Sequence, residues 1–321
     1  MAVTTESDRS ARLDTILVLR ALGLGDLLTA VPALRGLRRH HPGARIVLAA
    51  PGRYRELAMH TGAVDEVIDT PGLVPIRRAH ERPDLAVNLH GRGPQSIAAL
   101  LALRPRQLLT HRHDAYPDLP GPQWSQDLHE VQRWCALLHW AGIICRADDL
   151  HIERPQGYPD NSGVVVIHPG AGARARQWPA RRFAEVASAL SERGERVVIT
   201  GSHSEAPLAQ EIARAAHLPE SAVWPATSDL LALVALISDC RLLICGDTGV
   251  GHVATATGTP SVLLFGPTPP KHWGPPGDGR HIAIWAGDCG DPHADVPDSG
   301  LMLITASRVI AAAHDALAWC P

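Results

Sequence analysis

The sequence predicts an α/β fold of two doubly wound domains, each built on a parallel β-sheet. Short apolar runs typical of buried strands alternate along the chain with segments that have helical periodicity. This alternation occurs in two series, which are separated by a polar segment with two prolines and two glycines at 145–163. The length of 321 residues also exceeds the usual size of a single domain.

The first series is expected to form one domain over residues 1–150. Its strands are short runs of branched aliphatic residues that end at a glycine, a proline or a polar residue. Its helices repeat apolar residues at intervals of three and four. The expected strands are 15–20, 44–50, 66–70 and 84–91, and the expected helices are 26–40 and one within 124–142.

The second series predicts a domain over residues 160–304, and it restarts with the apolar run "VVVIH" directly after the polar segment. The expected strands are 164–168, 196–200, 241–246 and 261–266, and the expected helices are 181–193, 205–216, 228–238 and 249–257. A final helix within 305–321 is expected to pack back on the first domain.

The composition excludes several classes of protein. Hydrophobic residues make up 45% of the chain and charged residues 20%, and the net charge of −3 provides no basic surface for nucleic acid. The N-terminus is polar, and no apolar run reaches the roughly 18 residues needed to cross a bilayer, so we expect a cytoplasmic protein. The six cysteines include no Cys-x-x-Cys pair, so we expect neither a disulfide nor zinc.

The first predicted strand is followed by Gly23, Gly25 and then Asp26. A nicotinamide site would need a third glycine where Leu28 stands and an acid about 20 residues later, and the chain has neither. The Walker phosphate-binding sequence is also absent. Taken alone, Asp26 fits a helix cap, a ribose ligand or a catalytic base.

The loop after the strand at 164–168 combines glycine and alanine residues with two arginines. The stretch from His168 contains Gly170, Arg174 and Arg176. Backbone amides and a guanidinium in such a loop can bind a diphosphate, although a surface turn with solvated arginines fits the same residues.

A second candidate anion site follows the strand at 241–246. Asp247, Thr248 and Gly249 stand where the next helix begins, and His252 lies one turn later. Free amides and the helix dipole attract phosphate at such a position. The alternatives are an N-cap for Asp247 or Thr248 and a partly buried histidine for His252.

Four stretches in this order resemble the heptosyltransferases of glycosyltransferase family 9: "LRALGLGDLLTAVPALRGLR", "VVIHPGAGARARQWPARRFAEVASAL", "VVITGSHSE" and "LLICGDTGVGHVATATGTPSVLLFGPTPPKHWGP". The resemblance covers about residues 14–318. It implies a GT-B fold, in which two Rossmann-like domains face each other across a cleft. It also implies transfer of heptose from ADP-heptose to lipopolysaccharide core, with inversion and without a metal. The absence of an Asp-x-Asp motif in the chain agrees with a metal-independent mechanism.

The resemblance assigns roles to individual residues. Asp26 takes the place of the catalytic base, while Arg176 stands where lysine is common in the family. Glu205 is the expected ribose ligand, Thr227 is the expected contact to the base edge, and the role of Asp247 stays open. The expected donor side is His168, Gly170, Arg174, Arg176, Glu205, Thr227, Asp247, Thr248, Gly249 and His252. The expected acceptor side is Gly25, His90 and Arg92.

Three further residues near the acceptor side, His111, Arg112 and His113, fit either contacts to an anionic acceptor or solvated loop charge.

For the whole chain, the leading hypothesis is a glycosyltransferase that takes ADP-heptose or another nucleotide sugar. The alternatives are an epimerase or hydrolase on the same fold and a non-catalytic nucleotide-sugar-binding protein. We expect no metal and no cofactor beyond the nucleotide-sugar co-substrate, which is expected to be ADP-linked. The acceptor is expected to be a sugar, a glycolipid or a small molecule. The protein is expected to be a monomer without a nucleic-acid partner. Peripheral association with a membrane stays open.

Overall fold

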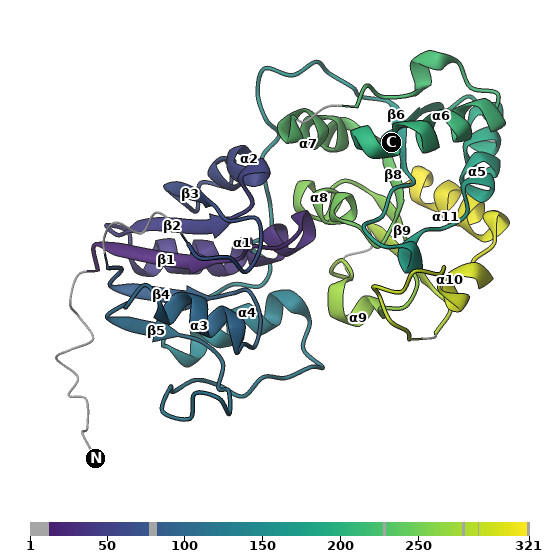
Figure 1. Ribbon diagram of the computed structural model, residues 1–321. Coiled ribbons are helices and arrows are strands. Elements are labelled where there is room, and N and C mark those ends of the chain that lie inside the picture. Colours follow the sequence, from purple (N-terminus) through teal and green to yellow (C-terminus); the bar gives the residue numbers. More distant parts are fainter. Residues whose placement is uncertain (1–12, 77–81, 227–228, 278–279, 288, 320–321) are drawn as a thin grey trace. The chain divides into compact units, whose positions relative to one another are not determined.

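The computed structural model describes residues 13–76, 82–226, 229–277, 280–287 and 289–319 (Figure 1). The chain divides into two compact units. The first runs to residue 126 and includes 131–149, and the second contains 127–130 and everything from residue 150 onward. Each unit has one parallel sheet with helices packed on it, so the predicted α/β class is confirmed.

The first unit contains a five-stranded sheet in the order β3-β2-β1-β4-β5, with every neighbouring pair parallel. Its strands are β1 (Thr15–Leu19), β2 (Arg45–Ala50), β3 (Glu66–Asp69), β4 (Leu85–Asn88) and β5 (Gln107–Leu109). Its helices are α1 (Leu24–His40), the 3-10 turn η2 (Gly52–Tyr54), α2 (Arg55–His60), α3 (Gln95–Leu101) and α4 (Glu130–Trp140). The strand order reverses between β1 and β4, and such switch points are where open α/β sheets bind ligands.

The central strand and the first helix provide much of the core of this unit. The apolar residues of β1 from Ile16 to Leu19 are at most 2% exposed. In α1, Leu27, Val31 and Leu34 are also buried, at the three- and four-residue spacing of an apolar helix face. The helix begins at Leu24, earlier than the expected 26, so Asp26 lies inside its first turn.

The second unit contains a five-stranded parallel sheet in the order β10-β9-β8-β6-β7. Its strands are β6 (Val164–His168), β7 (Arg196–Ile199), β8 (Leu242–Gly246), β9 (Ser261–Phe265) and β10 (His281–Trp285). Its helices are α5 (Ala180–Glu192), α6 (Ala206–Ala215), α7 (Leu230–Asp239), α8 (Gly249–Thr257), α9 (Pro270–Trp273), α10 (Ser299–Leu303) and α11 (Ala306–Ala318). Three 3-10 turns accompany them: η3 (Arg174–Arg176), η4 (His203–Glu205) and η5 (Glu220–Ala222). Here the strand order reverses between β6 and β8.

The C-terminal helix α11 packs within the second unit, beside α5 and β9 (Figure 1). Its buried residues Val309, Ala313 and Leu317 belong to the same core cluster as Ile167 of β6 and Leu264 of β9. Because this sheet already covers the apolar face of the helix, the expectation that residues 305–321 pack on the first domain is wrong.

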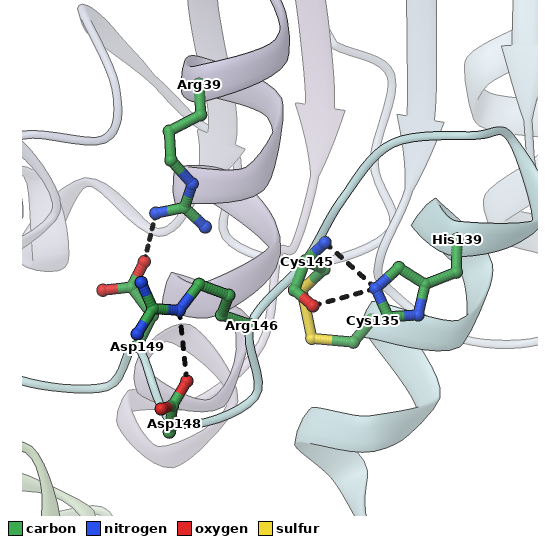
Figure 2. Close-up of a disulfide and its surroundings, with 7 residues drawn as sticks. All are labelled: Arg39, Cys135, His139, Cys145, Arg146, Asp148 and Asp149. Atoms are coloured by element: carbon green, nitrogen blue, oxygen red, sulfur yellow. Dashed lines mark hydrogen bonds and ion pairs between the residues drawn. A yellow bond between two sulfur atoms is a disulfide. The ribbon is translucent and has the colours of Figure 1, made fainter.

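The expectation of no disulfide is also wrong, because Cys135 of α4 is bonded to Cys145, with the two Cα atoms 5.1 Å apart (Figure 2). The helix ends at Trp140, and Gly142 adopts a positive φ of 77° that reverses the chain direction. The returning segment therefore lies against the helix. The Nε2 atom of His139 holds it there, at 3.0 Å from the Cys145 backbone N–H donor and 2.8 Å from its carbonyl oxygen.

Candidate functional site

Asp26 lies at the carboxyl end of β1, where its carboxylate contacts both the first turn of α1 and Arg20. Its Oδ2 atom accepts a hydrogen bond from the Gly23 backbone N–H at 3.1 Å, which closes the first turn of α1. Its Oδ1 atom lies 3.1 Å from Nη2 of Arg20. The Asp26 side chain is 26% exposed, whereas that of Arg20 is 1% exposed. Asp26 thus contributes to capping and still presents a carboxylate at the surface of the unit.

Arg20 is the residue at this site that the sequence interpretation missed. Its Nε donates to the backbone oxygen of Asp26 at 2.9 Å, and its Nη1 donates to the backbone oxygen of Leu89 at 2.5 Å. The guanidinium also lies 4.9 Å from the centre of the Trp134 ring. This buried cation therefore connects the end of β1, the start of α1 and the chain leaving β4. The available signal was a charged residue between an apolar strand and a glycine turn.

His90 lies beside this group, just beyond the end of β4. Its Nδ1 accepts the Ala21 backbone N–H at 3.2 Å, and its own backbone N–H donates to Oδ1 of Asn88 at 3.2 Å. Burial, assisted by the nearby Arg20 cation, lowers the pKa of His90 to about 4. The ring is therefore neutral at physiological pH. The structure thus brings Asp26 and His90 to the same switch point of the first sheet.

The other expected acceptor-side residues are less constrained or differently placed. Gly25 lies in the first turn of α1 beside Asp26, and Arg92 is exposed. His111 is 2% exposed and packs edge-on against Trp124, at 5.0 Å between ring centres, so it fits neither the acceptor contact nor solvated loop charge. Arg112 is exposed, and Nδ1 of His113 accepts the backbone N–H of residue 115.

In the second unit, three of the expected donor-side residues form one group beyond β6. His168 ends this strand, and its Nδ1 lies 3.1 Å from Oγ1 of Thr200. Burial lowers the pKa of His168, and the nearby Glu205 opposes that shift. A Cβ atom on Gly170 would lie 2.1 Å from Oε1 of Glu205, so a larger residue there would require the Glu205 carboxylate to move. The other carboxylate oxygen of Glu205 accepts from the backbone N–H and hydroxyl of Ser202, both at 2.8 Å, and so caps the start of η4.

Arg176 is drawn in toward β8, whereas Arg174 on the same turn η3 is exposed. Nη1 of Arg176 lies 3.4 Å from the backbone oxygen of Asp247. Its Nε is buried and has no hydrogen-bond partner among the described residues. Burial raises the pKa of the Asp247 carboxyl, and Arg176 opposes that shift. A donor that can bind an anion therefore lies beside an acid that resists ionisation.

Helix α8 follows β8 closely in the chain (Figure 1), and the side chain at its N-cap position makes no capping hydrogen bond. Thr248 stands at the N-cap position, but its hydroxyl makes no capping hydrogen bond, so the capping alternative is wrong for this residue. Gly249 is the first residue of the helix. Because the first amides of a helix have no partner within it, this end can bind an anion.

A small hollow opens beside this helix start. Its lining includes Asp247, Thr248 and His252, together with Trp273 and Pro275 from the region of α9. The rings of His252 and Trp273 meet edge-on at 6.0 Å. Three of the expected donor-side residues therefore line this hollow at the end of β8, and Arg176 joins them through its contact to Asp247. Thr227 lies outside the described residues.

Two general properties of the structure bear on the site. No helix in the described ranges is long and apolar enough to span a bilayer. In the same part of the chain, no group of three or more His, Cys, Asp or Glu side chains is placed to hold a metal ion.

Comparison with known proteins identifies relatives of the whole chain. The model of a family described as glycosyltransferase family 9 (heptosyltransferase) matches residues 103–293. Lipopolysaccharide heptosyltransferase 3 of Escherichia coli is 27% identical over 335 residues, which cover 90% of this chain and 95% of that protein.

Solved structures show the same fold. A family 9 glycosyl transferase from Veillonella parvula matches with a TM-score of 0.80 at 22% identity, covering 95% of this chain and 98% of the other. The ADP-heptose lipopolysaccharide heptosyltransferase II of E. coli matches with a TM-score of 0.77 at 23% identity, covering 95% and 99%. The predicted GT-B type, with two Rossmann-like domains, is confirmed by these similarities.

Proposed function

The chain belongs to glycosyltransferase family 9, and from this premise we propose that it transfers heptose from ADP-heptose to a hydroxyl of lipopolysaccharide core, with inversion and without a metal. The names of the relatives, a lipopolysaccharide heptosyltransferase and an ADP-heptose heptosyltransferase, support this donor and acceptor. The observation that carries the proposal is the chemistry at the two switch points. The first presents a carboxylate, and the second presents an anion-binding helix start with an arginine.

In the proposed reaction, Asp26 is the general base. The acceptor oxygen attacks the anomeric carbon, the bond from that carbon to the diphosphate oxygen breaks with its electron pair, and the acceptor proton passes to Asp26. A single displacement of this kind inverts the anomeric centre. The pairing with Arg20 at 3.1 Å fixes the orientation of the Asp26 carboxylate before the acceptor arrives.

The departing ADP carries the negative charge that develops in the transition state. We assign its stabilisation to the first amides of α8, beginning with Thr248 and Gly249, and to Arg176 and His252. The unpaired Nε of Arg176 provides a donor that no described residue occupies. Because burial raises the pKa of Asp247, this acid resists the negative charge that would repel a diphosphate, which supports a donor-side role for it.

Positive groups of the protein take the place of a divalent cation in this mechanism. The sequence has no Asp-x-Asp motif, which metal-dependent sugar transferases use to hold a cation on the diphosphate. Arginine replaces the lysine that is common in the family at position 176, so the charge is kept and a planar, bidentate donor is gained. The remaining expected contacts are proposed as part of the same site. They are His168, Gly170, Arg174, Glu205 and Thr227 for the donor, and Gly25, His90 and Arg92 for the acceptor.

The proposal is tested by measuring ADP release from ADP-heptose in EDTA. The acceptor is lipopolysaccharide purified from a strain that makes it without heptose. We expect ADP release only when this acceptor is present. Release at the same rate without acceptor would indicate a hydrolase, and consumption of neither substrate would contradict the proposal. If ADP release required a divalent ion, the metal-independent mechanism would be contradicted, but the proposed transfer of heptose would not.

A further inference from the structure

The imidazole ring of His90 is fixed at one of its two nitrogens. The Ala21 backbone N–H donates to Nδ1 at 3.2 Å, and the backbone N–H of His90 itself donates to Oδ1 of Asn88. The Asn88 side chain is in turn held by its Nδ2 atom, which donates to Ser96 Oγ at 3.1 Å and to Thr110 Oγ1 at 3.0 Å. The position of the ring is therefore set by backbone atoms and by a buried amide.

This arrangement determines where the ring proton lies. Nδ1 uses its lone pair to accept the Ala21 N–H, so in the neutral ring the proton must be on Nε2. Burial and Arg20 hold the pKa of His90 at about 4, so the ring stays neutral at physiological pH. Nε2 has no hydrogen-bond partner among the residues that the structure describes.

His90 and Asp26 are linked through Arg20. Arg20 binds the Asp26 carboxylate and also the backbone oxygen of Leu89, the residue that directly precedes His90. One buried guanidinium thus joins the proposed base to the backbone that carries the histidine. A sugar that presents one hydroxyl to Asp26 carries further hydroxyl oxygens, which can accept a hydrogen bond from an Nε2–H group.

We infer that His90 donates a hydrogen bond from Nε2–H to an oxygen of the acceptor sugar and so helps to orient the hydroxyl that Asp26 deprotonates. This inference rests on the proposed function and deepens it. It gives His90 the role of a neutral donor that selects a polyhydroxylated acceptor.

Two other roles for this histidine conflict with its surroundings. A second general base would need a lone pair on Nε2, and moving the proton to Nδ1 would break the bond from the Ala21 N–H. A cationic ligand for an acceptor phosphate would need a protonated ring, which the adjacent Arg20 guanidinium disfavours. Only the neutral donor role keeps every observed contact.

Two substitutions separate the donor from its anchor. His90→Asn places an amide oxygen near Nδ1, so it can still accept the Ala21 N–H, but it has no group at Nε2. His90→Gln reaches the Nε2 position with an amide N–H and loses the anchor. Loss of one neutral hydrogen bond should raise the acceptor KM of His90→Asn by about threefold to tenfold. The donor KM should stay at the wild-type value, and His90→Gln should recover most of the acceptor affinity.

The experiment uses ADP-heptose and heptose-free lipopolysaccharide, with melting curves to confirm that both variants fold. Long-range ¹⁵N–¹H spectra, with the His90 signals assigned by their loss in His90→Asn, should show the Nε2–H tautomer at neutral pH. A wild-type acceptor KM in His90→Asn, or an Nδ1–H tautomer, would overturn the inference. If the wild-type protein transfers no sugar, the proposed function itself has failed. If the wild type transfers sugar, the KM values of the variants test the role of His90 alone.

Discussion

Replacing Asp26 with asparagine separates its capping role from its proposed role as the base, because asparagine keeps a capping oxygen but cannot accept a proton. The oxygen can still bind the Gly23 N–H, which donates to Asp26 at 3.1 Å in the native chain. The ion pair with Arg20 at 3.1 Å is lost, and the guanidinium stays buried with its bonds to two backbone oxygens. Because Asp26 is about a quarter exposed, we expect the free energy of unfolding to fall by about 1–2 kcal/mol.

The effect on catalysis should be much larger than this loss of stability. Without a base, the rate of heptose transfer should fall roughly 10²- to 10⁴-fold, while ADP affinity stays near the wild-type value. Turnover is measured with saturating ADP-heptose and heptose-free lipopolysaccharide, and stability by denaturant unfolding of the same samples.

Asp84 provides the matched control for this substitution. It lies at the amino end of the same sheet, accepts the backbone N–H groups of Asp14 at 2.8 Å and Thr15 at 3.1 Å, and pairs with Arg106 at 3.3 Å. Asp84→Asn should therefore cost stability without slowing transfer. Normal turnover in Asp26→Asn, or an equal loss of turnover in Asp84→Asn, would refute the assignment of Asp26 as the base.

Three further predictions concern the donor site, the disulfide and the response to acid. Arg176→Ala should weaken ADP binding in EDTA by about 1.5–3 kcal/mol, as measured by titration calorimetry. Arg181→Ala serves as the control, because the Arg181 side chain is 91% exposed and has no role in the proposed site. An equal loss of ADP affinity in Arg181→Ala would contradict the assigned contact. Peptide mapping under non-reducing conditions should recover Cys135 linked to Cys145, and finding both thiols free would contradict the structure. Reduction of this disulfide, whose cysteines are 10 residues apart in the sequence, should lower the unfolding free energy by about 2–3 kcal/mol. The pKa of His90 is lowered from 6.5 to about 4. Between these values the unfolded chain binds more protons, so stability should fall as pH drops through this window. The fall should be smaller in His90→Asn, and parallel stability curves for the two proteins would contradict the shift.

The central strands were predictable from the sequence because their apolar runs are buried on both faces. β1, β6 and β8 read as continuous aliphatic segments, and each lies in the interior of its sheet. The edge strands β5 and β10 were missed. β5 has only three residues and begins with an exposed glutamine, and β10 is half-exposed along most of its length. An edge strand has one neighbour and little burial, so its sequence carries a weak pattern.

The site was predictable where a local motif marks it, and it was missed where long-range contacts build it. The glycine break marked Asp26 in the first turn of α1, and the glycine that begins α8 marked the proposed anion site. Arg20 escaped notice because its role depends on Leu89, 69 residues later in the sequence. The disulfide escaped for a similar reason, since only the chain reversal after α4 brings Cys145 to the helix.

The central claim is that this chain adds heptose to lipopolysaccharide by a single inverting displacement. The most direct test is the structure of the product made from ADP-heptose and heptose-free lipopolysaccharide in EDTA. Mass spectrometry should show the addition of one heptose, and NMR should show an anomeric configuration opposite to that of the donor. An acceptor of unchanged mass, or a product with the donor's configuration, would contradict the account.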